Sequence, residues 1–440
     1  MYLAFFQGFL LIAYMFHQTE SWDHRALAVY SIFVVGAFLI FKRQRNLVFG
    51  LAALPILYKY TVVFPNLANH SNLSFFLFLL LTTFSFYKFQ NAKIDSLTPL
   101  IKTLRLFALI TYFFAAFHKF NMDFFNPEVS CANDKMGEYL DLLPNFFDSS
   151  KVYLRRLLPL IGFLTEAIIP LFLFVPRLRY FGVLFQCGLH FLLAPLGFID
   201  FSSLALVLSW SFVNPHVSTN EVSLEKQLQT FGWSCVALVI GLGIFRWYPQ
   251  NEEYSFFEGI AFAVIFAPFV FKTILPKLDL ARISLPRPLV LQLATLLLFV
   301  YGFSNYLGLR TAGTFSMFSN IQTEGPTSNH LLLYSNPFKI FSYQEDLVEI
   351  ISVSENIRGF YRKMPQPGQV IPRVEFSRML DIMLEQNQQN AALEIIYDGQ
   401  ARTTQNAASD PNFYLPAPAW QKKLFKFRAV LKQGPQICAW

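Results

Sequence analysis

The sequence has few charged residues for its length. Of its 440 residues only 14% are charged, whereas 54% are hydrophobic and 18% are aromatic. Soluble domains carry about 25% charged residues, so this composition excludes an ordinary soluble protein. Long apolar runs recur instead, near residues 1–16, 26–41, 47–65, 73–87, 104–120, 157–175, 180–194, 197–213, 230–245, 257–271 and 289–306. Because about 15–20 residues can cross a bilayer, we expect an all-α polytopic membrane bundle of about 11 transmembrane helices.

Signatures of several other protein classes are also missing. The four cysteines show no CxxC or Cys/His spacing, which argues against a zinc or iron–sulfur site, so no metal is expected. The net charge of +7 is scattered over short loops, so nucleic acid is not an expected partner. The first apolar run has neither a basic region before it nor a small-residue cleavage site after it, so we expect it to remain as a helix.

Two of the cysteines, Cys131 and Cys438, lie outside the apolar runs, whereas Cys187 and Cys235 lie within them. If the first two face an oxidising compartment, we expect them to be either both free or paired with each other.

The distribution of lysine and arginine among the loops indicates the orientation. The break at Ala194-Pro195-Leu196-Gly197 divides residues 180–213 into two short spans. With this division, the cytoplasmic loops hold about twice as many lysines and arginines as the outer loops. This predicts a multi-pass protein with a cytoplasmic N-terminus and an extracytoplasmic C-terminus. It also places His70, His118 and His190 where three different apolar runs meet the outer surface.

The composition changes after the last apolar run, which divides the chain into three parts. Residues 1–312 are the predicted transmembrane domain. Residues 313–330 are small, polar and turn-forming, and form either an ordered loop over the bundle or a linker. Residues 331–440 have ordinary soluble polarity and are predicted to be a small α+β extracytoplasmic region. Its expected strands are 347–353 and 392–397, and its expected helices are 371–387 and 419–431.

Ionisable groups at the ends of the apolar runs are the first candidates for a site. The run from Leu104 ends on His118 and Lys119, followed by Asn121 and Asp123. A charged side chain at the middle of a membrane helix costs about 2.5–3.5 kcal/mol, so such residues call for an explanation. Interfacial anchoring is one explanation and a shared functional site is the other. Glu166 is too short to reach either surface easily and is expected to be functional or ion-paired.

Three short segments resemble motifs of one known family. Ala115-Ala116-Phe117-His118-Lys119-Phe120-Asn121-Met122-Asp123 resembles the Ala-Gly-x-x-Lys-Leu-x-x-Asp motif of the vitamin K-dependent γ-carboxylase-like membrane proteins, also called the horizontally transferred transmembrane (HTTM) domain family. Asn69-His70-Ser71 resembles their Asn-His-Ser segment, and Cys187-Gly188-Leu189-His190 resembles a helix that ends in a Phe-His pair. The segments occur in the family's order, and the resemblance covers about residues 1–330.

The resemblance implies a quinol-dependent carboxylase. Lys119 takes the place of the base that activates vitamin K hydroquinone or another quinol, in a catalytic set with three histidines (His70, His118 and His190). The cofactor would be bound by Glu166, Asn121 and Asn69, and the substrate would be a carboxylate side chain of a secreted peptide at the outer leaflet of the lipid bilayer.

The sequence departs from the animal carboxylases at His118, where they carry a further lysine, and in its short C-terminal region. The alternative function is therefore a non-enzymatic membrane helper that binds or matures a secreted peptide.

Overall fold

The computed structural model describes the chain except for residues 20–24, 91–96, 142–143, 145–146, 216–220, 247–253, 355–364, 387–390, 408 and 439–440. The chain forms two compact units, each assembled from several segments. Unit 1 comprises Met1–Val62, His70–Phe113 and Thr165–Phe299. Unit 2 comprises Val63–Asn69, Phe114–Leu164 and Val300–Trp440.

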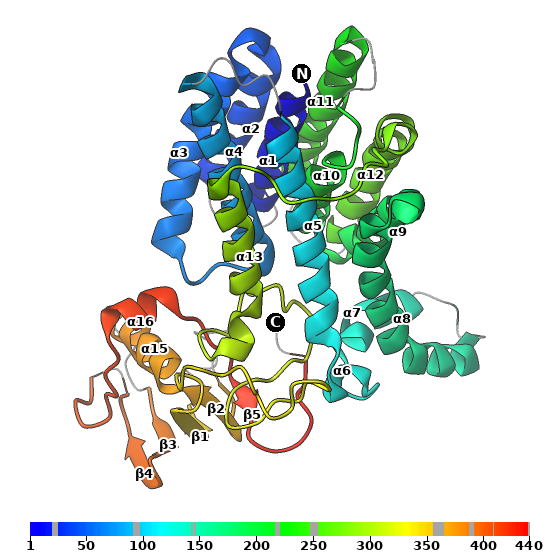
Figure 1. Ribbon diagram of the computed structural model, residues 1–440. Coiled ribbons are helices and arrows are strands. Elements are labelled where there is room, and N and C mark those ends of the chain that lie inside the picture. The colour runs from blue at the N-terminus through cyan, green and yellow to red at the C-terminus, as the bar shows by residue number, and fades with distance from the viewer. Residues whose placement is uncertain are drawn as a thin grey trace. The chain divides into compact units, whose positions relative to one another are not determined.

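Every apolar run predicted from the sequence lies on a helix (Figure 1). The helices before the sheet are α1 (Tyr2–Thr19), α2 (Arg25–Ile40), α3 (Arg45–Val63), α4 (Asn69–Gln90), α5 (Thr98–Lys119), α6 (Met122–Phe125), α7 (Cys131–Asp141), α8 (Asp148–Phe174), α9 (Arg179–Leu193), α10 (Ile199–Trp210), α11 (Glu221–Arg246), α12 (Tyr254–Phe269) and α13 (Leu289–Leu307). The expected break between α9 and α10 is confirmed, because a short 3-10 turn at Ala194–Leu196 is followed by Gly197 at φ +88°.

The expected number of spans is not supported. Among the described residues, five stretches are long and apolar enough to cross a membrane: Lys42–Val63, Thr98–Lys119, Ser150–Phe174, Phe257–Lys277 and Leu289–Leu307. The apolar helices Arg25–Ile40 and Ile199–Trp210 have 16 and 12 residues, fewer than the roughly 20 that span a bilayer unaided. Large apolar side chains on the long helices are exposed, as at Leu51, Leu171 and Leu289. These features indicate a membrane protein.

Helices α1 and α10 form the aromatic centre of unit 1. Almost every residue of α10 is buried, as expected for a helix that is apolar on all sides. The ring of Trp210 stacks on Phe5 at a centroid distance of 4.1 Å, and Phe9 and Phe269 lie around the same indole ring. Aromatic pairs at these distances add about 0.5–1.5 kcal/mol each beyond burial, so this cluster fixes how α1 packs against α10.

The C-terminal part of unit 2 is the α+β structure that its sequence predicts. Its strands β1 (Leu347–Val353), β2 (Gln369–Pro372), β3 (Leu393–Tyr397), β4 (Gln400–Thr404) and β5 (Val430–Leu431) form an antiparallel sheet in the order β4-β3-β1-β2-β5. Helix α15 (Arg373–Glu385) packs on it through Phe376 and Met379, which share a core with Val348 and Ile395. The predicted strands 347–353 and 392–397 are confirmed, and α15 occupies most of the predicted helix 371–387.

The helix expected over 419–431 is wrong in its second half. Helix α16 covers only Ala419–Leu424, and the chain is then extended up to β5. Phe425 and Phe427 alternate with exposed or half-buried residues, and both are buried against Val374. This period of two is typical of an extended segment, so burial of the two rings outweighs the helical propensity of the lysines.

Residues 313–330, called the polar loop from here on, are packed inside unit 2. Thr314, Ser316, Ser319 and Thr323 are all fully buried, which favours the ordered loop over the linker among the two predicted alternatives. Since buried polar groups require hydrogen-bond partners, the contacts of this loop determine its conformation.

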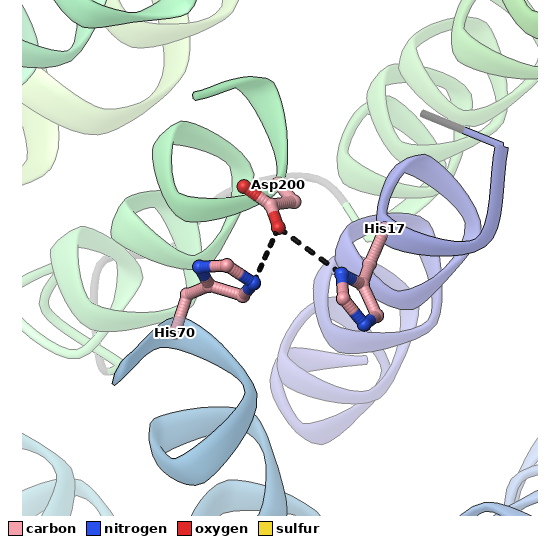
Figure 2. Close-up of side chains that lie close together, drawn as sticks. All are labelled: His17, His70 and Asp200. Atoms are coloured by element: carbon pink, nitrogen blue, oxygen red, sulfur yellow. Dashed lines mark hydrogen bonds and ion pairs between the residues drawn. The ribbon is translucent and has the colours of Figure 1, made fainter. Parts of the chain in front are cut away.

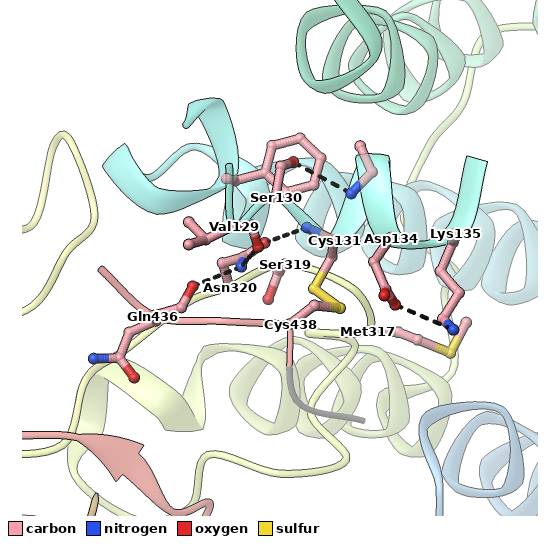
Figure 3. The surroundings of a disulfide bond; sticks show 12 residues. Val129, Ser130, Cys131, Asp134, Lys135, Met317, Ser319, Asn320, Gln436 and Cys438 are labelled. Carbon is pink, nitrogen blue, oxygen red and sulfur yellow. Dashed lines mark hydrogen bonds and ion pairs between the residues drawn. A yellow bond between two sulfur atoms is a disulfide. The ribbon is translucent and has the colours of Figure 1, made fainter. Parts of the chain in front are cut away.

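Of the two predicted alternatives for Cys131 and Cys438, the structure shows the pairing, with 4.8 Å between the two Cα atoms (Figure 3). Asn320 of the polar loop lies beside the disulfide. Its Oδ1 accepts a hydrogen bond from the Cys131 backbone, and its Nδ2 donates to the carbonyls of Val129 and Gln436. The start of α7, the polar loop and the C-terminal tail are therefore joined by one side chain and one covalent bond.

Candidate functional site

The end of α5 presents its polar residues to the polar loop. His118 is fully buried, and its Nε2 lies 3.1 Å from the carbonyl oxygen of Thr314. A carbonyl can only accept, so Nε2 carries the proton and Nδ1 accepts from the hydroxyl of Tyr306 at 2.9 Å. The imidazole also stacks on the ring of Phe114. These contacts hold His118 as a neutral tautomer with a fixed orientation.

Lys119 and Asn121 bind the next part of the same loop. The Nζ of Lys119 donates to the carbonyl of Met317 at 3.1 Å and lies 5.9 Å from the centre of the Phe124 ring. Only 6% of Lys119 is exposed, which is low for a lysine, because this side chain normally reaches water. The amide nitrogen of Asn121 donates to the Ser319 carbonyl, and its Oδ1 accepts from the backbone of Phe124.

Asn69 reaches the loop from another part of unit 2. Its Oδ1 accepts from the backbone nitrogen of Ser316 at 3.2 Å. Four of the seven predicted site residues therefore contact residues 314–319, namely Asn69, His118, Lys119 and Asn121. His118, Lys119 and Asn121 are close together in the sequence, whereas Asn69 comes from a distant segment to the same short loop.

The backbone of this loop is unusual. Phe315, Phe318 and Asn320 have φ values of 62°, 52° and 51°, although none of them is glycine. Left-handed residues with a side chain cost about 1–3 kcal/mol each, and they cluster at functional sites when their surroundings hold them. The side chains at the end of α5 and Asn69 supply such surroundings. The sequence left these residues as either an ordered loop or a linker, and nothing in it indicated the left-handed positions.

His330 ends the polar loop as a second neutral imidazole. Its Nε2 donates to the Phe117 carbonyl at 3.0 Å, and its Nδ1 accepts from the backbone nitrogens of Leu332 and Leu333. Burial lowers the pKa of His330 to about 4, although the hydrogen bond to Phe117 favours the charged form. Protonation would place a hydrogen on Nδ1 between two N–H donors and break both bonds.

This arrangement predicts a pH-dependent stability. Because the pKa of His330 is lower in the folded than in the unfolded chain, the stabilisation is present above about pH 6.5 and is lost as the pH falls toward about 4. Over this window the free energy of unfolding should fall by about 3 kcal/mol through this group, since one pKa unit corresponds to about 1.4 kcal/mol. The thermal unfolding midpoint of the His330→Gln variant should depend less on pH over this window than that of the wild type. Equal pH dependence in the two proteins would contradict the role given to His330.

The other three predicted site residues belong to unit 1. His190 is fully buried on α9, with Nε2 2.7 Å from the hydroxyl of Tyr112 and Nδ1 3.4 Å from Ser202 Oγ. Glu166 is half-buried on α8. That His70, His118, Lys119 and His190 line one pocket stays a prediction.

His70 takes part in a cluster that sequence reasoning missed (Figure 2). Asp200 Oδ2 lies 2.8 Å from His70 Nε2 and 3.1 Å from His17 Nδ1. The three side chains come from the end of α1 and the starts of α4 and α10, all in unit 1. Asp200 is 3% exposed. The sequence did contain a signal, because Asp200 lies inside the apolar run 197–213. An ionisable residue within a membrane segment is a candidate functional residue.

Comparisons with known proteins add no family. No family model, no curated protein and no solved structure matches the chain.

Proposed function

We propose that the chain is an integral membrane enzyme of the vitamin K-dependent carboxylase type, which uses a quinol cofactor to carboxylate a glutamate side chain of a secreted peptide. The observation that carries the proposal is the burial of Lys119 at the end of an apolar helix, against a strained polar loop. The order of the three sequence motifs supports the same family. An anchoring lysine would extend into water instead.

Lys119 would act as a base on a hydroxyl of the cofactor. Only a neutral amine has a lone pair with which to accept a proton, and it still has two hydrogens to donate. The carbonyls of Met317 and Ala115, at 3.1 and 3.4 Å from Nζ, are placed to accept these hydrogens. These two contacts orient the amine.

The surroundings of His118 also suit a quinol. Aromatic rings surround it, with Phe114 and Tyr306 stacked on the imidazole. The side-chain nitrogen of Asn305 is buried and has no hydrogen-bond partner among the described residues, while its Oδ1 accepts from Thr314. We infer that the side-chain nitrogen of Asn305 donates a hydrogen bond to a cofactor oxygen. It would bind the cofactor together with Asn121 and Asn69. When bound, the reduced quinone would supply, through its oxidation by molecular oxygen, the driving force for removing a weakly acidic proton from glutamate.

The test is carboxylation by the full-length protein in lipid nanodiscs. We expect labelled carbon dioxide to enter a glutamate-rich peptide only when vitamin K hydroquinone and oxygen are both present. Incorporation that needs no quinol would reject the cofactor. Stable peptide binding without incorporation, under conditions in which a known carboxylase is active, would favour the non-enzymatic helper.

We further propose the finer topology, with the N-terminus in the cytoplasm and the C-terminal α+β region outside. The Cys131–Cys438 disulfide supports it, since disulfides persist in oxidising compartments. Alkaline phosphatase fused after Trp440 should be active, and green fluorescent protein at the same point should be dark. The opposite pair of results would reverse the orientation and place the disulfide in the cytoplasm.

A further inference from the structure

We propose that His17, His70 and Asp200 bind a divalent transition-metal ion, with Zn²⁺ as the best fit. This site goes beyond the proposed carboxylase function and does not depend on it. One potential ligand atom from each residue lies within 4.8 Å of the other two. The cluster combines two imidazoles, which bind metals in their neutral form, and one carboxylate. This donor set is found in catalytic zinc sites and in non-haem iron sites.

The distances in the cluster fit a metal centre after a small adjustment. At a metal–ligand distance of about 2.0–2.2 Å, neighbouring ligand atoms lie roughly 3.0–3.5 Å apart. Asp200 Oδ2 is already 2.8 Å from His70 Nε2 and 3.1 Å from His17 Nδ1. The two imidazole rings are 5.2 Å apart between centroids and inclined at 63°, so they do not stack and block the space between them.

The groups around the cluster would orient the ligands. Ser71 Oγ lies 3.4 Å from His17 Nε2, the nitrogen that faces away from Asp200. The other oxygen of Asp200, Oδ1, accepts from the backbone nitrogen of Phe201 at 2.6 Å. Hydrogen bonds to the second polar atom of a ligand side chain fix its orientation. The atom that faces the other ligands then stays available for a metal.

The site is also accessible, and its three protein ligands leave the coordination of a metal ion incomplete. The side chains of His17 and His70 are 29% and 17% exposed, while Asp200 is 3% exposed. The exposed side gives an entry path for the ion. Three protein ligands leave at least one coordination position for water or for an oxygen atom of a substrate, as in catalytic rather than structural zinc sites.

Metal binding can be measured on the full-length protein without any activity. The protein, purified with a tag that contains no histidine, is stripped with a chelator and titrated with Zn²⁺, or with Co²⁺ as a coloured probe. We expect one ion per chain and a Co²⁺ spectrum of nitrogen and oxygen ligation. Asp200→Asn and His17→Ala should abolish stoichiometric binding, and Ser71→Ala should weaken it by about 10–100-fold. Asp141→Asn, at an exposed carboxylate paired with Arg155, should bind like the wild type.

Two results would overturn the site. The first is a folded wild-type protein that retains neither ion in stoichiometric amount. The second is His17→Ala, at the most exposed of the three positions, with unchanged affinity and spectrum. If Asp200→Asn does not fold, the wild-type titration and the His17→Ala variant still decide. If either of the two results is obtained, the cluster is a hydrogen-bonded His-Asp-His group and not a metal site. Because carboxylation is not measured, the metal site and the proposed function can fail separately.

Discussion

Replacing Lys119 by alanine should lower kcat/KM for peptide carboxylation by about 10²–10⁴-fold, the usual contribution of a positioned general base. The variant loses the only group that the proposed reaction assigns to deprotonating the quinol. It also loses the contact with the Met317 carbonyl, which costs about 1 kcal/mol of stability for an ordinary hydrogen bond. Thermal unfolding of the variant must therefore be measured together with activity, so that misfolding is not taken for lost chemistry.

Two further measurements separate a base from a structural lysine. Lys119→Arg keeps a cation and its hydrogen-bond donors, but a guanidinium stays protonated, so activity should remain almost as low as in the alanine variant. Small primary amines should restore part of the activity of Lys119→Ala in proportion to their neutral form. Lys135→Ala, at a lysine paired with Asp134, is the matched control and should retain wild-type activity.

If Lys119→Arg is active, or if added amines restore nothing while the fold is intact, Lys119 only holds the polar loop. The buried geometry would then be explained by the structural contacts of Lys119, among them the one with the Met317 carbonyl, and the family resemblance would lose its principal residue.

The helices were predictable because their signal is local. Each apolar run is longer than a strand, and its composition alone places it in a helix. Whether a helix spans the membrane is a different question. Helix α10 is as apolar as a membrane span, yet it has 12 residues and is buried on all sides. Composition does not distinguish a helix covered by lipid from one covered by other helices, so apolar runs alone do not establish the number of spans.

The extended segment after Leu424 was predicted wrongly because its local sequence favours another structure. Its lysines favour a helix, and only the position of Phe425 and Phe427 against Val374 reveals the strand-like conformation. Such tertiary contacts outweigh local propensity and are not visible in a single sequence.

The candidate site was predictable in part. Placing ionisable residues at helix ends is costly, and this cost singled out Lys119 and His118. The partners of these residues are backbone carbonyls of the polar loop, and a carbonyl leaves no mark in the sequence. His70 was chosen from its motif, but its partner Asp200 was overlooked because it stands alone in an apolar run.

Removing the disulfide should have the largest effect on stability. The Cys131–Cys438 bond closes a loop of 307 residues in sequence, and a native disulfide typically contributes about 2–5 kcal/mol. In the chain-entropy account, most of this stabilisation arises because the bond restricts the conformations of the unfolded chain. The double variant with alanine at both positions should lower the free energy of unfolding of unit 2 by this amount.

The effect should be local to the elements that meet at Asn320. This side chain holds the carbonyls of Val129 and Gln436, and without the covalent bond the C-terminal tail is kept in place by noncovalent contacts such as the one with Gln436. We expect proteases to cleave the tail faster in the double variant. The matched control has alanine at Cys187 and Cys235, the two buried free cysteines of unit 1, and its tail should be as resistant as in the wild type.

The wild-type protein offers a direct check. Without reduction, alkylating reagents should label neither Cys131 nor Cys438 in the unfolded chain, and mass spectrometry should recover the two peptides linked. Peptides that link either residue to Cys187 or Cys235 would refute the pairing. Equal unfolding midpoints for the double variant and its control would show instead that the packing around Asn320, rather than the bond, holds the tail against α7.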